Sequence, residues 1–303
     1  MTQTTGRPDA FKQQEAIVVE SAPGITITVR VWPTTDAQAP VVLILPAMAM
    51  KAKHYAPLIK ALNKSGVQVA TCDLRAQGEA RPAIADCPDF GYREMLEEDL
   101  PAIIDAVCQR FEATRIHLFG HSLGGQLALL RTAAQGTQGQ VASVTIIGTG
   151  TVFWRAFGPR RWIEALSTIQ WIGLVARVRG SWPGGILIPG PMAGGVMIDW
   201  SRHSLTARYR PKGTKLNYDE LISKLDLPVL AISLDDDTLG PKSNVDFLVR
   251  KLASARVTRW HIEGDSSITH RGHVDWLADS RLLAPVVRQW IETGELATPG
   301  PVE

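Results

Sequence analysis

The sequence is poor in cysteine. Only Cys72, Cys87 and Cys108 occur among 303 residues, an odd number at irregular spacing. This pattern fits neither a disulfide framework nor a zinc site. Because unpaired thiols are typical of a reducing compartment, we expect the protein to be cytoplasmic.

Long apolar runs are also missing. No run of 18 or more apolar residues occurs, so no transmembrane helix is expected. The most apolar stretch, 184–200, is broken by two prolines and five glycines, and we expect it to be an irregular buried or pocket-lining segment. The first 15 residues are polar and lack the apolar centre of a signal peptide.

The sequence also lacks a charge imbalance. Lys and Arg total 32 against 30 Asp and Glu, which gives a net charge of +2. This charge gives no reason to expect nucleic acid or an anionic membrane as partner, although it is compatible with a local basic patch. Hydrophobic residues make up 45% and charged residues 20%, which excludes a disordered chain, a collagen-like chain and a coiled coil.

Short apolar runs alternate with amphipathic helical patterns along most of the chain. Val41–Leu45 reads VVLIL, as expected of a strand buried on both faces of a parallel sheet. This alternation predicts an α/β fold with a mostly parallel central sheet flanked by helices. The predicted strands are 16–19, 25–32, 41–45, 67–71, 116–119, 141–147, 229–234 and 257–262, and the predicted helices are 54–64, 92–111 with an interruption at Pro101, 123–134, 243–252 and 282–293.

The alternation stops after Gly150 and resumes near residue 226. The intervening residues, 151–225, are rich in Gly, Pro and Arg and hold five of the nine tryptophans. We expect a cap, or lid, inserted after the sixth strand, with 15–150 and 226–295 as the core and 1–14 and 296–303 as flexible tails. The cap tryptophans include three candidates for lining a pocket, although packing of the cap on the core is the simpler role for any one of them: Trp154, Trp171 and Trp182.

The segment Gly120-His121-Ser122-Leu123-Gly124 has the pattern G-x-S-x-G and stands between a predicted strand and a predicted helix. That context is typical of a sharp turn that exposes a nucleophilic serine. Small residues on both sides allow close packing, and the first N–H groups of the helix point toward a developing negative charge. An ordinary strand–helix turn with a capping serine is the alternative.

Three consecutive acidic residues follow the strand 229–234. A serine hydroxyl needs a base, and that base needs a carboxylate to orient it. We favour Asp237 for this role, and Asp235 and Asp236 remain alternatives. A solvated acidic turn would account for the other two.

The base is expected between the last strand and the last helix, in Thr269-His270-Arg271-Gly272-His273. We favour His273, with His270 as the alternative. His121 flanks the serine, and its side chain is expected to point away from the nucleophile. The order Ser122, Asp237, His273 is that of the α/β-hydrolases, and each residue follows a predicted strand.

The chain resembles α/β-hydrolase-fold proteins, close to the serine aminopeptidase-like and lysophospholipase-like branch. The similarity spans about 16–293 and is strongest in 41–82, 116–130, 228–241 and 270–277. Within that branch, Pro46-Ala47 stands where most relatives have His-Gly. In this feature the chain resembles a group of predicted hydrolases with largely unassigned substrates.

The resemblance implies an oxyanion hole made of two backbone N–H groups, those of Met48 and Leu123. Ala47 and His121, which precede the oxyanion loop donor and the serine, complete the candidate pocket residues. One loop departs from the family pattern: Ala76 replaces a glycine and Ala80 a serine in Arg75-Ala76-Gln77-Gly78-Glu79-Ala80. This loop shapes the pocket floor in relatives, so their substrates are a weak guide here.

The sequence therefore predicts a serine hydrolase acting on a small, largely apolar carboxylic ester or thioester, with no metal or organic cofactor. Three alternatives remain open. The same three residues serve acyl transfer, and they serve an aminopeptidase if an acidic cap residue, Glu164 or Asp199, holds the substrate amine. The third alternative is a ligand-binding or receptor-like protein that retains the fold without turnover.

Overall fold

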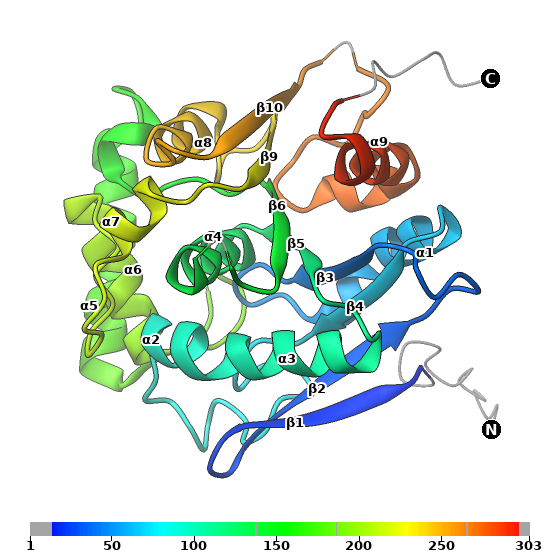
Figure 1. Ribbon diagram of the computed structural model, residues 1–303. Coiled ribbons are helices and arrows are strands. Elements are labelled where there is room, and N and C mark those ends of the chain that lie inside the picture. Colours follow the sequence, from blue (N-terminus) through cyan, green and yellow to red (C-terminus); the bar gives the residue numbers. More distant parts are fainter. Residues whose placement is uncertain (1–13, 137, 186, 265, 297–303) are drawn as a thin grey trace, which may run out of the picture.

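The computed structural model describes residues 14–296 except 137, 186 and 265, so the expected tails lie outside it apart from Gln14 and Leu296. Eight strands form one sheet in the order β1-β2-β4-β3-β5-β6-β9-β10 (Figure 1). The pairs β1–β2 and β2–β4 are antiparallel, and all other pairs are parallel. The strands are β1 (Ala16–Ala22), β2 (Ile25–Trp32), β3 (Val41–Leu45), β4 (Gln68–Cys72), β5 (Ile116–His121), β6 (Val141–Ile147), β9 (Pro228–Leu234) and β10 (Arg256–Ile262).

The sheet is buried on both faces because its central strands are apolar throughout. In β3, Val42 and Ile44 belong to one core cluster, while Val41, Leu43 and Leu45 belong to the other. This two-residue period is what a pleated strand between two helical layers requires. One layer consists of α1 (Ala56–Lys64) and α9 (Ser280–Thr293), and the other of α3 (Leu100–Arg110), α4 (Leu123–Gln135) and α8 (Lys242–Val249).

The predicted helix 92–111 consists of three parts. A short α2 (Tyr92–Glu94) is followed by a π-helix over Met95–Asp99 and then by α3. The N–H of Leu100 donates to the carbonyl of Met95, five residues earlier. This wider turn lies directly before Pro101, whose ring has no N–H and crowds the carbonyl four residues back.

The cap segment, 151–225, lies between β6 and β9 and contains three helices. They are α5 (Trp162–Arg179), α6 (Gly194–Thr206) and α7 (Tyr218–Ser223), with a small hairpin of β7 (Ser181–Trp182) and β8 (Met192–Ala193). The expectation of an irregular segment over 184–200 is wrong in its second half, where β8 and α6 form. Glycine at 194 and 195 does not prevent this helix, because its buried face packs into the molecule.

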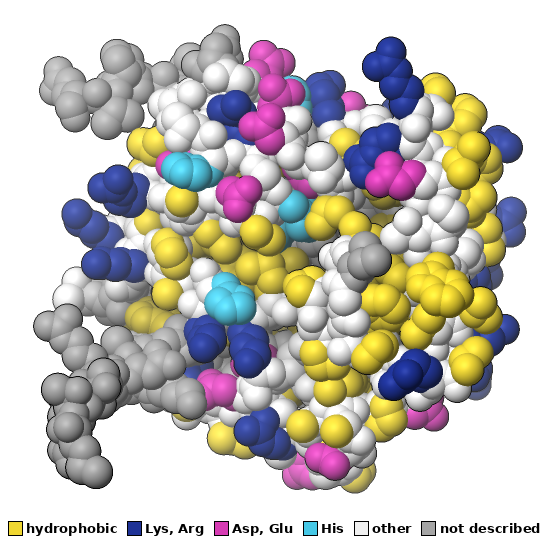
Figure 2. Space-filling model, turned by 180° about the vertical axis from the view of Figure 1, so that it is seen from behind, with side chains coloured by type: hydrophobic (Ala, Val, Ile, Leu, Met, Phe, Trp, Pro, Cys, Tyr) yellow, Lys and Arg dark blue, Asp and Glu magenta, His cyan; other side chains and the backbone are white. Residues whose placement is uncertain are grey.

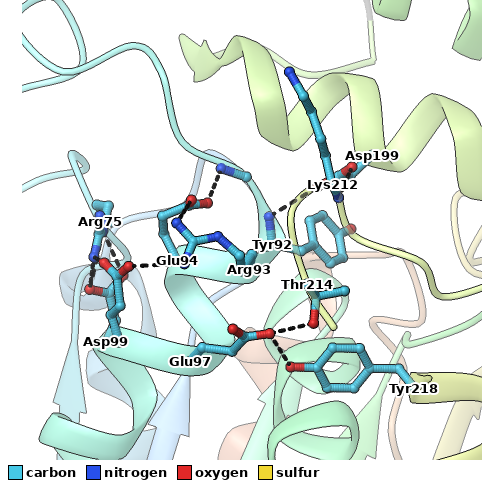
Figure 3. Close-up of polar contacts among 12 residues, drawn as sticks. Arg75, Tyr92, Arg93, Glu94, Glu97, Asp99, Asp199, Lys212, Thr214 and Tyr218 are labelled. Carbon is cyan, nitrogen blue, oxygen red and sulfur yellow. Dashed lines mark hydrogen bonds and ion pairs between the residues drawn. The ribbon is translucent and has the colours of Figure 1, made fainter. Parts of the chain in front are cut away.

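The backbone of α2 and a side chain of the π-helix bind the cap segment to the core, as Figure 3 shows. Asp199 of α6 accepts hydrogen bonds from the backbone N–H groups of Tyr92 and Lys212. Glu97 accepts hydrogen bonds from the hydroxyls of Thr214 and Tyr218. The expected α/β fold is thus confirmed, whereas the division into core and cap domains stays a prediction.

A buried ion pair joins the loop after β4 to the π-helix. Asp99 accepts hydrogen bonds from Arg75 Nη2 at 2.6 Å and from the Ser21 hydroxyl of β1 at 2.6 Å (Figure 3). Both side chains of the pair are at most 5% exposed. A buried pair of this kind destabilises the fold when one partner is removed, because an unpaired charge is left inside.

We expect Asp99→Ala to lower the free energy of unfolding by about 3–5 kcal/mol, measured by urea denaturation. The matched control is Asp226→Ala, which removes an ion pair to Arg256 at 2.8 Å with both side chains more than half exposed. Its expected cost is about 0–1 kcal/mol. Equal losses in the two variants would show that burial of the Arg75–Asp99 pair carries no extra weight.

Candidate active site

Ser122 stands at the turn between β5 and α4 in a strained backbone conformation. Its φ is 52° and its ψ is −116°, a region that non-glycine residues rarely occupy. The turn is closed by tight packing at Gly124, where a Cβ atom would lie 2.1 Å from the Leu45 carbonyl oxygen of β3. The elbow therefore needs glycine at 124 so that α4 can begin directly beside β3.

Asp237 and His273 form a close pair. The two carboxylate oxygens of Asp237 lie 2.9 and 2.8 Å from Nδ1 of His273. Asp237 is 2% exposed, and its Oδ1 also accepts the backbone N–H groups of Leu239 and Gly240. Three donors thus hold this carboxylate in place.

The alternatives for the acid and the base lie elsewhere. Asp235 and Asp236 are exposed, the latter paired with Arg271 at 3.1 Å. His270 is exposed and lies 3.2 Å from Asp279. The structure therefore brings together Asp237 and His273, the pair favoured from the sequence, and none of the three alternatives.

The surroundings of His273 fix its position. The indole N–H of the buried Trp276 donates to the His273 carbonyl at 3.0 Å. Gly148, at the end of β6, lies against the pair: a Cβ there would be 2.9 Å from Asp237 and 3.3 Å from the His273 ring. Its φ of +54° is a second reason for glycine at this position.

Ser122 and His273 line the same cavity, of about 200 Å³. Among the described residues no hydrogen bond joins the Ser122 hydroxyl to His273. Such contacts are often loose before substrate binds. The cavity wall is largely apolar and includes Ala47, Met48, Phe157, Ala165, Ile169, Leu187, Ile188, Trp200, Leu239 and Val274.

The inner end of the cavity is polar. The Tyr92 hydroxyl donates to Gln126 Oε1 at 3.0 Å, and Gln126 Nε2 donates to the Gly150 carbonyl at 2.8 Å. The Thr151 hydroxyl lies 2.7 Å from Nε2 of the buried His203. No motif marks these residues in the sequence, because their contacts arise only where α2 meets α4 and where α6 meets the segment after β6.

The loop Pro46–Met50 passes beside the elbow. The Met50 N–H donates to the Ala47 carbonyl, and Ala49 has a φ of 58°, which together define a tight turn. Within the described chain, the backbone N–H groups of Met48 and Leu123 have no hydrogen-bond acceptor. Both residues line the cavity.

His121 lies behind the cavity rather than in its wall. It is fully buried, its Nδ1 lies 2.7 Å from the Tyr55 hydroxyl, and its ring centroid is 4.9 Å from that of His273. The same Tyr55 hydroxyl accepts the Ala47 N–H at 2.8 Å. His121 is therefore not a residue of the pocket wall, contrary to the expectation from the sequence.

The three candidate tryptophans do not border the cavity either. Trp171 is 62% exposed on the outer side of α5. Trp182 is buried and its indole N–H donates to the Ile188 carbonyl, while Trp154 packs edge-on against Trp162. Trp154 and Trp182 therefore pack within the cap segment, whereas Trp171 faces solvent. Trp200 is the cap tryptophan that lines the cavity.

The two acidic residues considered for an aminopeptidase are differently placed. Asp199 is buried, accepts two backbone N–H groups and lies outside the cavity wall (Figure 3). Glu164 borders the cavity at its mouth, with its side chain 65% exposed and 3.4 Å from Arg161. The described residues contain no group of three His, Cys, Asp or Glu side chains arranged to hold a metal.

Three histidines are held neutral by burial. Loss of hydration lowers the pKa of His117 to about 4 and that of His203 to about 3. Burial, with a smaller contribution from nearby His273, lowers the pKa of His121 well below its usual 6.5. His117 and His261 are each bonded to a strand serine, Ser143 and Ser233, as expected for histidines on strands.

These lowered values predict acid sensitivity. Below pH 6.5 these histidines bind protons in the unfolded chain but remain neutral in the folded protein. The free energy of unfolding therefore falls as the pH is lowered from 7 to 5. The slope approaches about 1.4 kcal/mol per pH unit for each histidine. Urea denaturation at several pH values measures it. His117→Gln should flatten the slope, and an unchanged slope in that variant would contradict the assignment.

The comparisons with known proteins agree with this geometry. A family model described as serine aminopeptidase, S33, matches residues 36–182, just under half of the chain. No curated protein sequence matches significantly. Together with the solved structures below, the match shows that the chain is similar to serine aminopeptidases and has the fold of the α/β-hydrolases, as the sequence resemblance implied.

Three of the solved structures illustrate the likeness. The esterase Est1E from Butyrivibrio proteoclasticus, with ferulic acid bound, has 15% identity, a TM-score of 0.62 and coverage of 91% of this chain and 98% of its own. The esterase RhEst1 from Rhodococcus sp. ECU1013 has 21% identity, a TM-score of 0.56 and coverage of 92% and 98%. A thioesterase domain from the curacin biosynthetic pathway has 17% identity, a TM-score of 0.57 and coverage of 90% and 98%.

Proposed function

We propose that the protein is a serine hydrolase that cleaves a carboxylic ester or thioester of a small, largely apolar substrate through an acyl-Ser122 intermediate. The observation that carries this proposal is the buried Asp237–His273 pair, 2.8 Å apart, beside a cavity that Ser122 also lines. The esterases and the thioesterase among structures of the same fold agree with it.

In the proposed reaction, Ser122 Oγ attacks the substrate carbonyl carbon as its proton passes to Nε2 of His273. Asp237, on the opposite ring nitrogen, holds the ring and stabilises its positive charge. His273 then gives the proton to the leaving alcohol or thiol. Water, deprotonated by the same histidine, attacks the acyl-serine and releases the acid, so that Ser122 regains its proton.

The oxyanion is proposed to bind the N–H groups of Met48 and Leu123. Neither group has another acceptor in the described chain, and both residues line the cavity. Leu123 is the first residue of α4, where the helix dipole also favours a negative charge. Pro46 has no N–H, and the turn over Ala47–Met50 orients the donor that follows it.

Tyr55 is proposed as a positioning residue for this oxyanion hole. Its buried hydroxyl joins Ala47, which directly precedes Met48, to His121, which directly precedes Ser122. One hydroxyl therefore ties the loop that carries one donor to the elbow that carries the nucleophile. Such indirect support limits how far the donors drift from the transition-state geometry.

Acyl transfer with the same residues differs only in an acceptor that replaces water. The aminopeptidase alternative retains one support, Glu164 at the cavity mouth, because Asp199 is already bonded to two backbone N–H groups. A retained fold without turnover remains the non-enzymatic alternative. We favour ester hydrolysis, since the wall between Ser122 and the mouth is largely apolar.

We further propose a cytoplasmic location. Cys72, Cys87 and Cys108 are all unpaired thiols, two of them buried. No helix in the described chain is long and apolar enough to cross a membrane.

Ser122→Ala should lower kcat/KM for p-nitrophenyl esters by about 10³-fold or more, since the nucleophile is lost. Labelling by a fluorophosphonate probe should also be lost. The matched control is Ser254→Ala, at an exposed serine far from the cavity lining. Probe labelling that persists in Ser122→Ala would refute the assignment, and labelling without ester turnover in the wild type would favour another acyl acceptor.

Tyr55→Phe should lower kcat roughly tenfold while KM changes little, because the oxyanion donors lose support but the cavity wall is intact. Ester kinetics with both parameters resolved measure this. Tyr209→Phe is the matched control, since that hydroxyl is buried without a hydrogen-bond partner in the described chain. Equal kcat in wild type and Tyr55→Phe, or a loss confined to KM, would argue against a positioning role.

A further inference from the structure

The outer face of α5 is unusually apolar for a surface. Ile163, Trp171, Leu174 and Val178 are 84%, 62%, 52% and 77% exposed. Figure 2 shows hydrophobic side chains gathered on the side of the molecule where α5 lies, next to the central hollow. A large apolar patch on a protein surface marks a site of interaction.

These four side chains lie on one stripe of the helix. At 100° per residue, their positions fall within about 80° of arc. The adjacent arc carries Ala165, Thr168 and Ile169, which line the cavity. One helix thus presents one side to the candidate active site and the neighbouring side to solvent.

The charges around this stripe are mostly positive, with Glu164 in the first turn of α5 as the exception. Exposed arginines stand at both ends of α5: Arg160 before it, and Arg177 and Arg179 in its last turn. In the described chain none of the three forms an ion pair or hydrogen bond. Between residues 151 and 194 the sequence has five arginines and one acidic residue, Glu164. The whole-chain charge of +2 conceals this local excess.

This charge pattern disfavours a second copy as partner. A symmetric dimer through α5 would place the same stripe against itself. Antiparallel pairing would set Arg160 against Arg177 and Arg179, and parallel pairing would set each arginine against its own copy. An anionic surface complements both ends at once, and tryptophan with aliphatic residues suits the boundary between lipid headgroups and acyl chains.

We propose that α5 docks the protein on an anionic lipid surface, lying in its plane with Ile163, Trp171, Leu174 and Val178 toward the acyl chains. The arginines at the ends of the helix contact lipid phosphates. Three exposed apolar residues that border the cavity, Leu187, Leu239 and Val274, bring its mouth close to the same surface. The proposal rests on this surface alone and is independent of the catalytic assignment.

Sedimentation with vesicles tests the proposal on the full chain. Wild-type protein should pellet with vesicles of equimolar phosphatidylglycerol and phosphatidylcholine, and less with phosphatidylcholine alone. Val178→Glu should lower the bound fraction at least about fivefold. The matched control, Val18→Glu, changes a valine that is 68% exposed on β1 and should bind like wild type. The double variant Arg177→Gln/Arg179→Gln should bind more weakly and with less dependence on salt.

Circular dichroism and light scattering on each variant separate docking from misfolding and self-association. Absence of pelleting by folded wild-type protein would overturn the proposal. Equal pelleting of Val178→Glu and Val18→Glu would overturn it too, since the stripe would then be irrelevant. A wild-type dimer that Val178→Glu dissociates, without vesicle binding, would assign the face to a second copy. None of these results depends on ester turnover.

Discussion

The strained backbone of Ser122 persists only because four elements, β3, β5, α4 and β6, are packed around it. A residue at such φ and ψ costs about 1–3 kcal/mol, so the surroundings must over-determine it. β3 supplies the Leu45 carbonyl against which Gly124 closes, β5 and α4 set the angle of the turn, and β6 accepts the Ser122 N–H through Ile147. Asp237 and His273 lie at the same sheet edge because β9 and β10 run parallel to β6, which places their following loops beside the turn at Ser122.

The sheet can be predicted from the sequence because its central strands are buried on both faces. Short apolar runs such as VVLIL at Val41–Leu45 are typical of strands that bury every side chain. All eight predicted strands form, and their observed ends lie within three residues of the predicted ends. The cap segment was not readable in the same way. Helix α5 is apolar on its outer side as well as its inner one, so it has no helical period, and α6 begins at two glycines that suggest a loop.

The sequence predicts some residues of the candidate site and misses others, because the contacts made by a side chain depend on packing that the sequence does not show. Asp237 was favoured over two neighbours, and the structure buries that carboxylate while leaving the others exposed. Its catalytic role stays a prediction. Tyr55, Tyr92 and Gln126 carried no signal, because a hydroxyl or amide in an amphipathic helix acquires meaning only from what packs against it. The tryptophans misled in the opposite sense: residue type suggested a pocket, whereas Trp171 faces solvent.

Arg161 connects the start of α5 to the loop that follows β9. Its Nη1 donates to the carbonyl of Thr238 at 2.7 Å. The residue at the N-terminal end of α5 is therefore hydrogen-bonded to the residue that follows Asp237. It also borders the cavity. Any outward swing of the first turn of α5 has to break this hydrogen bond. The position of that turn and the order of the loop that carries Asp237 are therefore mechanically coupled.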